Sequence, residues 1–207
     1  YDHTLKFVPD IVEWGQKHID IVHILVFIAY RAAPIHKGYD YYVGGNKIDM
    51  SPIAYANDEE RKIGIMSTDI VETIRTKYPD FQPCAYLNGT ERPDHFKWLL
   101  TMRIGTKEKI FGYAGAKFME LSQTLHHLVK DCYLAYTKPE VLGRAKSMLA
   151  LSPIDKGLRQ TRKAYLHDAL RSPKLLFKKL HMQSVMIIQP ADFMQNGALS
   201  MCDSCPD

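Results

Sequence analysis

Two nearly continuous apolar runs constrain the fold of this chain more than any other feature. Residues 21–30 read IVHILVFIAY, and residues 185–188 read VMII. Runs this rich in β-branched residues are typical of strands covered on both faces, as in a parallel sheet with helices outside it. A strand at residues 4–8 and a helix opened by Pro9 and Asp10 are predicted before the first run. Strand, helix and buried strand together predict an α/β protein.

The middle of the sequence predicts an inserted, mainly helical α+β region. Strands are expected at residues 84–87, 97–104 and 110–113, the last two as a hairpin, although residues 97–104 also fit a helical period. A capping pattern at Asp69 starts a helix. Residues 117–136 predict a helix with one buried side, and Pro139, Pro153 and Pro173 begin three more. That side consists of Phe118, Leu121, Leu125, Leu128, Val129, Cys132 and Tyr133. Residues 38–57 are predicted as a long irregular loop.

Composition and charge exclude several classes of protein. The chain has 207 residues, 46% of them hydrophobic and 24% charged, which is typical of a soluble globular domain. Its net charge of +4 is scattered. The most basic stretch, residues 159–179, has Leu at helical spacing and is interpreted as a solvated helix face rather than a polyanion site. The scattered charge predicts no nucleic-acid partner. No run is long enough to span a membrane, so no membrane partner is predicted and cytoplasmic location is the default.

The spacing of two cysteines near the end of the sequence points to metal chemistry. Cys202 and Cys205 lie three residues apart, and Pro206 follows. Such a pair suits one metal ion or one corner of an iron–sulfur cluster, and a redox dithiol, half a zinc site or two ordinary cysteines are the alternatives. Cys84 and Cys132 add no recognisable spacing, so the site lacks ligands. The first residue is Tyr, and an excerpt from a longer protein is expected.

A few other polar residues are candidates for a site. Arg31 follows the first buried run, at the strand end where α/β proteins bind ligands, and suits a carboxylate or phosphate. Its structural alternative is an ion pair at the rim of the sheet. His36 is expected to be plain surface. His126 and His127 point about 100° apart on a helix and are not expected to share a metal ion.

Two segments together resemble a known family. Residues 7–31, from Phe7-Val8-Pro9-Asp10 to Ala29-Tyr30-Arg31, and residues 196–207, which read NGALSMCDSCPD, resemble the C-terminal half of a radical S-adenosylmethionine protein with a SPASM-like auxiliary region. The resemblance implies later βα units of a partial (β/α) barrel. It divides the chain into a βαβ part with the following loop at residues 1–58, an inserted region at 59–180, a final strand and exit at 181–199, and the start of the auxiliary region at 200–207.

This resemblance implies a function for the parent protein. Members bind a [4Fe-4S] cluster through a Cys-x3-Cys-x2-Cys loop, reduce S-adenosylmethionine to a 5'-deoxyadenosyl radical and abstract hydrogen from a substrate. Cys202 and Cys205 would ligate an auxiliary cluster, Arg31 would bind the S-adenosylmethionine carboxylate or a substrate anion, and the partners would be a small-molecule or peptide substrate and an electron donor. The Cys-x3-Cys-x2-Cys loop does not occur in these 207 residues, so the isolated chain is expected to be inert and metal-free. The alternative is a non-catalytic α/β binding or scaffold module with zinc or no metal.

Overall fold

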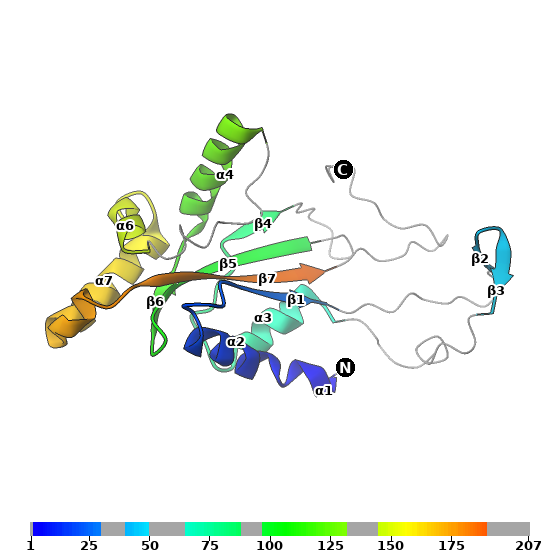
Figure 1. Cartoon of the computed structure of the whole chain (residues 1–207), viewed down its shortest axis with the longest axis horizontal. Coiled ribbons are helices and arrows are strands. Elements are labelled where there is room, and N and C mark those ends of the chain that lie inside the picture. Colours follow the sequence, from blue (N-terminus) through cyan, green and yellow to red (C-terminus); the bar gives the residue numbers. More distant parts are fainter. Residues whose placement is uncertain (1, 30–39, 50–64, 88–96, 132–144, 190–207) are drawn as a thin grey trace.

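The computed structural model describes residues 2–29, 40–49, 65–87, 97–131 and 145–189, and these carry a mixed sheet with helices on both faces (Figure 1). Its strands are β1 (Ile24–Ile28), β4 (Ala85–Leu87), β5 (Lys97–Gly105), β6 (Ile110–Tyr113) and β7 (His181–Gln189). The strand order is β1-β7-β5-β4, and β6 also pairs with β5. A separate hairpin joins β2 (Tyr41–Val43) to β3 (Asn46–Ile48).

Strand β7 organises the sheet, because it pairs along one side with β1 and along the other with β5. Strand β1 runs parallel to it, with Ile24 opposite Ser184 and Ile28 opposite Ile188. Strand β5 runs antiparallel to it over nine residues, from Lys97 to Gly105. Segments more than 150 residues apart in the sequence therefore lie side by side.

Two helices cover one face of the sheet. Helix α2 (Val8–Lys17) follows the short helix α1 (Asp2–Leu5), and α3 (Ser67–Arg75) begins after the chain re-enters the described part at Ile65. Pro lies in the first turn of α2, where its missing N–H costs no hydrogen bond. The core on this face is a cluster of buried aliphatic and aromatic side chains: Val8, Val12, Leu25, Ala29, Ile70, Val71, Ile74, Phe81, Leu99, Val185 and Ile187.

The opposite face is covered by α4 (Ala116–Lys130), α6 (Ala145–Met148), the 3-10 turn η2 (Leu149–Leu151) and α7 (Lys156–Arg171). A second 3-10 turn, η3 (Pro173–Leu176), leads from α7 into β7. The core of this face is larger and contains, among others, Leu100, Met102, Ile104, Phe111, Phe118, Met119, Leu149, Leu158, Tyr165, Met182 and Met186. The layers are therefore helix, sheet and helix.

The α/β class predicted from the sequence is confirmed, and so are the β5–β6 hairpin and the helix opened at Asp155. The barrel remains a prediction. Residues 59–180, predicted as an insertion, supply β4, β5 and β6 to the same sheet as β1 and β7. Within the described ranges no helix is both long and apolar enough to cross a membrane.

Four local predictions are wrong. Residues 4–8 comprise the end of α1, a turn at Lys6 and Phe7, and the first residue of α2, which begins one residue before Pro9. Strand β1 is not covered on both faces: the side chains of Val26 and Ile28 are 46% and 68% exposed, and β1 is also the outermost of the described strands on its side of the sheet. Helix α4 ends at Lys130, where Asp131 adopts a left-handed conformation. Residues 38–57 contain the β2–β3 hairpin, whose turn uses positive φ angles at Gly44 and Gly45.

The predicted buried side of α4 is also wrong. Phe118 packs into the core, but Leu121, Leu125, Leu128 and Val129 are exposed by 37%, 53%, 75% and 74%. The C-terminal part of the helix extends away from the sheet, so its apolar stripe has no described residues beneath it (Figure 1).

Candidate functional site

The carboxyl ends of β1 and β7 define the candidate site, because both strands end at the same edge of the sheet. The Ala29 amide donates to the Ile188 carbonyl at 2.7 Å, so the pairing continues to the last residues of both strands. Beside them, the Ser67 amide at the start of α3 donates to Gln189 Oε1 at 3.0 Å. Gln189 is 1% exposed. The edge thus brings together the ends of two parallel strands and the start of a helix, the usual place for ligands in α/β proteins.

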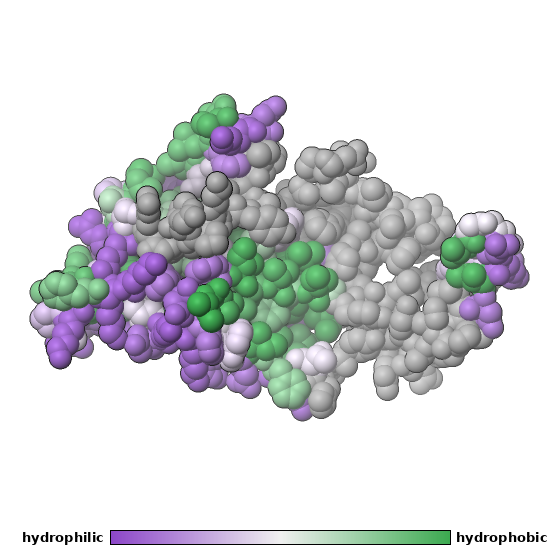
Figure 2. Space-filling view, viewed as in Figure 1, coloured by the Kyte–Doolittle hydropathy of each residue, from purple (hydrophilic) through white to green (hydrophobic). Residues whose placement is uncertain are grey.

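A row of apolar side chains crosses the sheet at this edge. Ile28, Ile188 and Trp98 are register partners in β1, β7 and β5, so they share the face that carries α4 and α7. Ile28 is largely exposed and the other two are half-buried. Figure 2 shows hydrophobic surface where Figure 1 draws β1 and β7. The Trp98 indole Nε1 is buried and has no hydrogen-bond partner among the described residues, so the row includes one unused donor.

The predicted site residues lie outside the described residues. Arg31 comes three residues after the end of β1, and Cys202 comes thirteen after the end of β7. Cys205, His36 and Cys132 also lie outside. What the structure adds is the placement of the two strands that precede Arg31 and Cys202, which are parallel neighbours ending at one edge.

The described histidines and the one described thiol do not form a metal site. His126 and His127 lie on α4, and no group of three His, Cys, Asp or Glu in the described segments could hold a metal ion. Cys84 is buried, and its Sγ donates to the Leu100 carbonyl at 3.2 Å. Burial raises the pKa of this thiol to about 11, so it is protonated at neutral pH and is a structural core residue.

Sequence reasoning missed a buried polar network beneath α2. Arg103 and Gln183 are register partners on β5 and β7, and both are 0% exposed. The Arg103 guanidinium donates to Gln183 Oε1 through Nε at 2.7 Å and to the Val12 carbonyl at 2.7 Å, and Gln183 Nε2 donates to the Gly15 carbonyl at 2.8 Å. The two side chains therefore bind carbonyls in the middle and in the last turn of α2. The sequence signal was a pair of polar residues two positions apart in β5, Thr101 and Arg103.

Burial lowers the pKa of Arg103 to about 10, although the nearby Tyr113 and Tyr78 phenols counteract this. The guanidinium remains charged at neutral pH. One of its nitrogens, Nη1, is buried without a partner among the residues that the structure describes. No carboxylate faces it within that part of the chain, so its hydrogen bonds to neutral acceptors hold it in place.

A second polar cluster occupies the opposite, amino edge of β1 and β7. His23 precedes β1, His181 begins β7, and Asp20 forms an ion pair with Lys107 at 2.8 Å. Within the described ranges, Asp20 Oδ1 and the Nδ1 atoms of both histidines are buried without partners. Burial lowers the pKa of His181 and the Lys179 charge lowers it further, whereas Asp20 raises it. The net effect lowers the pKa of His181 and so favours its neutral form. The cluster lies at the edge where α/β proteins do not usually bind ligands.

Comparison with known proteins identifies no relative: no family model, no curated protein and no solved structure matches the chain.

Proposed function

We propose that this chain is part of a cytoplasmic radical S-adenosylmethionine enzyme that abstracts hydrogen from a small-molecule or peptide substrate. The chain would supply later βα units of a partial barrel and two ligands, Cys202 and Cys205, of an auxiliary iron–sulfur cluster. Arg31 would bind the carboxylate of S-adenosylmethionine or an anion of the substrate. An electron donor would be the protein partner.

One observation carries this proposal: β1 and β7 are parallel neighbours whose carboxyl ends lie at one edge of the sheet. Arg31 follows the first strand and the cysteine pair follows the second. Residues from distant parts of the sequence thus leave the sheet from adjacent positions, as a ligand site at strand ends requires. The apolar row of Ile28, Ile188 and Trp98 at the same edge suits the uncharged part of a substrate.

The open edge of the sheet agrees with this placement in a larger barrel. Among the described strands, β1 has no partner on the side away from β7, and its exposed Val26 and Ile28 are not the charges or prolines that usually protect an edge strand. On α2, Ile11 and Trp14 are 44% and 53% exposed. A further strand and helix would cover both surfaces.

The two cysteine side chains are of the type that binds iron–sulfur clusters. Thiolates are the ligands of iron–sulfur clusters, which supply the electron for radical chemistry when bound. Cys84 is buried, and its Sγ already donates to the Leu100 carbonyl inside the core. The Cys-x-x-Cys spacing points to Cys202 and Cys205 as the ligands, with further ligands supplied from elsewhere.

Anaerobic reconstitution of the full-length protein with iron and sulfide tests the proposal. We expect broad visible absorbance, part of which is lost in Cys202→Ala and Cys205→Ala and retained in Cys84→Ala. Iron content unchanged by the first two substitutions refutes the ligand assignment. Colourless protein that takes up zinc through the same pair supports the alternative, a non-catalytic module.

Binding of S-adenosylmethionine to the reconstituted protein tests the role of Arg31. Loss of a bidentate guanidinium–carboxylate pair in Arg31→Ala is expected to weaken binding by about tenfold or more, with partial recovery in Arg31→Lys. Arg171→Ala, a substitution on the exposed surface, is the control. Equal affinity of all three variants contradicts the assignment.

A further inference from the structure

One end of the molecule carries an excess of positive charge that the whole-chain value conceals. Residues 145–180 contain nine Lys and Arg and two Asp, a net charge of +7 against +4 for the whole chain. The remaining residues therefore carry −3. This segment comprises α6, η2, α7 and η3, which lie together beyond the amino end of β7 (Figure 1).

The acids of this region are already engaged. Asp155 is 2% exposed and accepts backbone hydrogen bonds, and Asp168 pairs with Lys109 at 2.6 Å. Glu108, from the turn between β5 and β6, pairs with Lys178 at 2.9 Å. By contrast, Lys163, Lys174 and Lys179 are exposed and form no ion pair with another described residue. Their charges remain available to an anionic partner.

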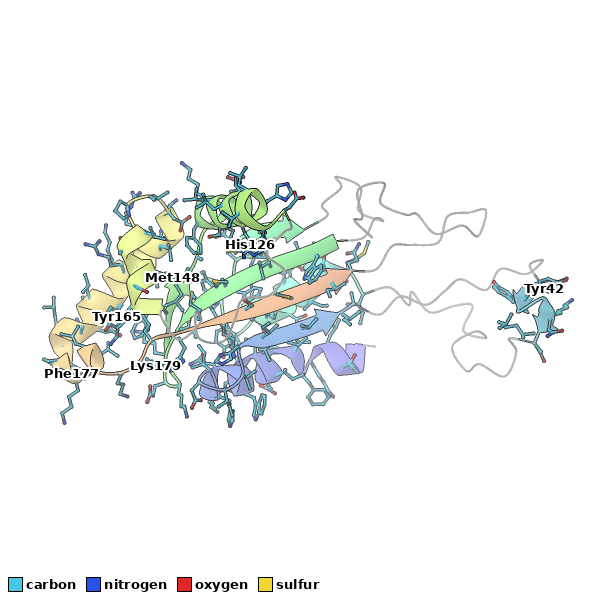
Figure 3. The ribbon with its side chains drawn as sticks, turned by 45° about the horizontal axis from the view of Figure 1, so that its top comes forward. Tyr42, His126, Met148, Tyr165, Phe177 and Lys179 are labelled. Atoms are coloured by element: carbon cyan, nitrogen blue, oxygen red, sulfur yellow. The ribbon has the colours of Figure 1, made fainter. Side chains whose placement is uncertain are left out.

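Large apolar side chains lie among these lysines. Leu166 and Leu170 are 44% and 84% exposed, and Phe177 is 90% exposed. The buried side of α7 is formed by Leu158, Thr161, Tyr165 and Ala169, so Lys163, Leu166 and Leu170, spaced three and four apart, share the outward side. We call Lys163, Leu166, Leu170, Lys174, Phe177 and Lys179 the α7 tip. Figure 3 shows Phe177 at the extreme end of the molecule, with Lys179 between it and the sheet.

We propose that the α7 tip binds the surface of an anionic lipid bilayer. Phe177 and Leu170 would enter the boundary between headgroups and acyl chains, and the lysines would contact the anionic headgroups. A projecting apolar centre with a lysine rim matches the composition of interfacial helices, in which apolar burial and attraction to anionic lipid act together. The sequence-based prediction of no membrane partner rested on the lack of a run long enough to span a bilayer, a criterion that does not address binding to a bilayer surface.

The same residues fit nucleic acid less well. Single-stranded nucleic acid is bound on several aromatic side chains within a basic groove, whereas the α7 tip has one aromatic ring and projects outward. Two of the three arginines in residues 145–180, whose guanidinium groups could hold phosphates, are engaged by neutral acceptors, and the third, Arg171, is exposed. Arg159 donates to the Pro153 carbonyl at 3.0 Å, and Arg162 donates to Ser152 Oγ at 2.9 Å. The exposed lysines and aliphatic groups instead favour a bilayer.

Co-sedimentation of the chain with vesicles tests the proposal. Binding is expected to vesicles of phosphatidylcholine containing phosphatidylserine at about 30 mol%, an anionic surface, and not to phosphatidylcholine alone. It is also expected to weaken as salt is raised from about 0.1 to about 0.5 M, since the charges are exposed. The double variant Leu170→Ser with Phe177→Ser is expected to bind at least about tenfold less tightly. The triple variant Lys163→Gln, Lys174→Gln and Lys179→Gln is expected to lose about 100-fold.

Matched controls come from α4. Leu128→Ser removes an apolar side chain that is 75% exposed, and Lys117→Gln with Lys130→Gln removes two exposed charges. Both controls are expected to bind vesicles like the unaltered chain. All of these positions are exposed, and circular dichroism confirms that each variant is folded. Equal binding to neutral and anionic vesicles, no binding to either, or unchanged binding by the α7 tip variants overturns the proposal. A single-stranded RNA homopolymer is added as a competitor. If it binds the chain at a lower concentration than the lipid vesicles do, the α7 tip is a nucleic-acid surface and the proposal is overturned.

Discussion

Asp155 fixes the start of two helices, and its removal is the most direct test of how the helical layer is attached to the sheet. Its Oδ1 accepts from the Leu158 amide at 2.8 Å, capping α7, and from the Gly115 amide at 2.9 Å. Its Oδ2 accepts from the Phe118 amide at 3.2 Å, in the first turn of α4. One buried carboxylate therefore satisfies three backbone donors from two helix starts.

Asp155→Ala leaves all three amides without their acceptor in a site that is 2% exposed. A hydrogen bond to a charged group contributes about 1.5–3 kcal/mol, and loss of an N-cap costs about 1–2 kcal/mol. Because these contributions overlap, we expect the free energy of unfolding to fall by about 4 kcal/mol. For a chain of this size, that corresponds to a decrease in Tm of about 8–16 °C.

Thermal and urea unfolding followed by circular dichroism measure this loss. The control is Asp168→Ala, because Asp168 forms an exposed ion pair with Lys109 and is expected to contribute less than about 1 kcal/mol. Gly115→Ala is a second variant at the same site, since a Cβ there would collide with the Asp155 carboxylate. If Asp155→Ala loses no more stability than Asp168→Ala, the double-cap reasoning is wrong.

Three further predictions concern buried polar and ionisable groups. Arg103→Met is expected to lower the free energy of unfolding by about 3 kcal/mol, because it leaves Gln183 without its buried hydrogen-bond donor. In urea unfolding, the double variant with Gln183→Leu is expected to lose less stability than the sum of the two single variants. Additive losses would contradict a shared network. The lowered pKa of His181 means that the unfolded chain takes up a proton first as pH falls below 6.5. Stability is therefore expected to decrease from about pH 6.5 toward 5, with a shallower slope in His181→Gln, and equal slopes would refute this. Burial raises the pKa of Cys84 to about 11, so this thiol is expected to resist alkylation at pH 8 in the folded chain, as measured by peptide mass spectrometry. Alkylation as fast as in urea would show that the thiol is not buried in the folded chain.

Local signals account for the elements that were predicted well. Pro153 and Asp155 begin α7 because a proline turn and a capping carboxylate act within a few residues. The hairpin of β5 and β6 was predictable because its strands are joined by a short turn. Sequence also supplied the candidate residues Arg31, Cys202 and Cys205, whose positions remain predictions. The parallel pairing that relates the strands before them came only from the structure.

The sequence by itself determined the α/β character of this protein, since apolar runs and helical periods depend on neighbouring residues. Only the tertiary structure decided that β7 lies between β1 and β5, that β1 is the outermost described strand on its side, and that Val26 and Ile28 are exposed. The same holds for Arg103, whose partner Gln183 is 80 residues away. Strand order and buried polar pairs depend on contacts between distant segments, and periodicity within one segment carries no information about which segment will lie beside it.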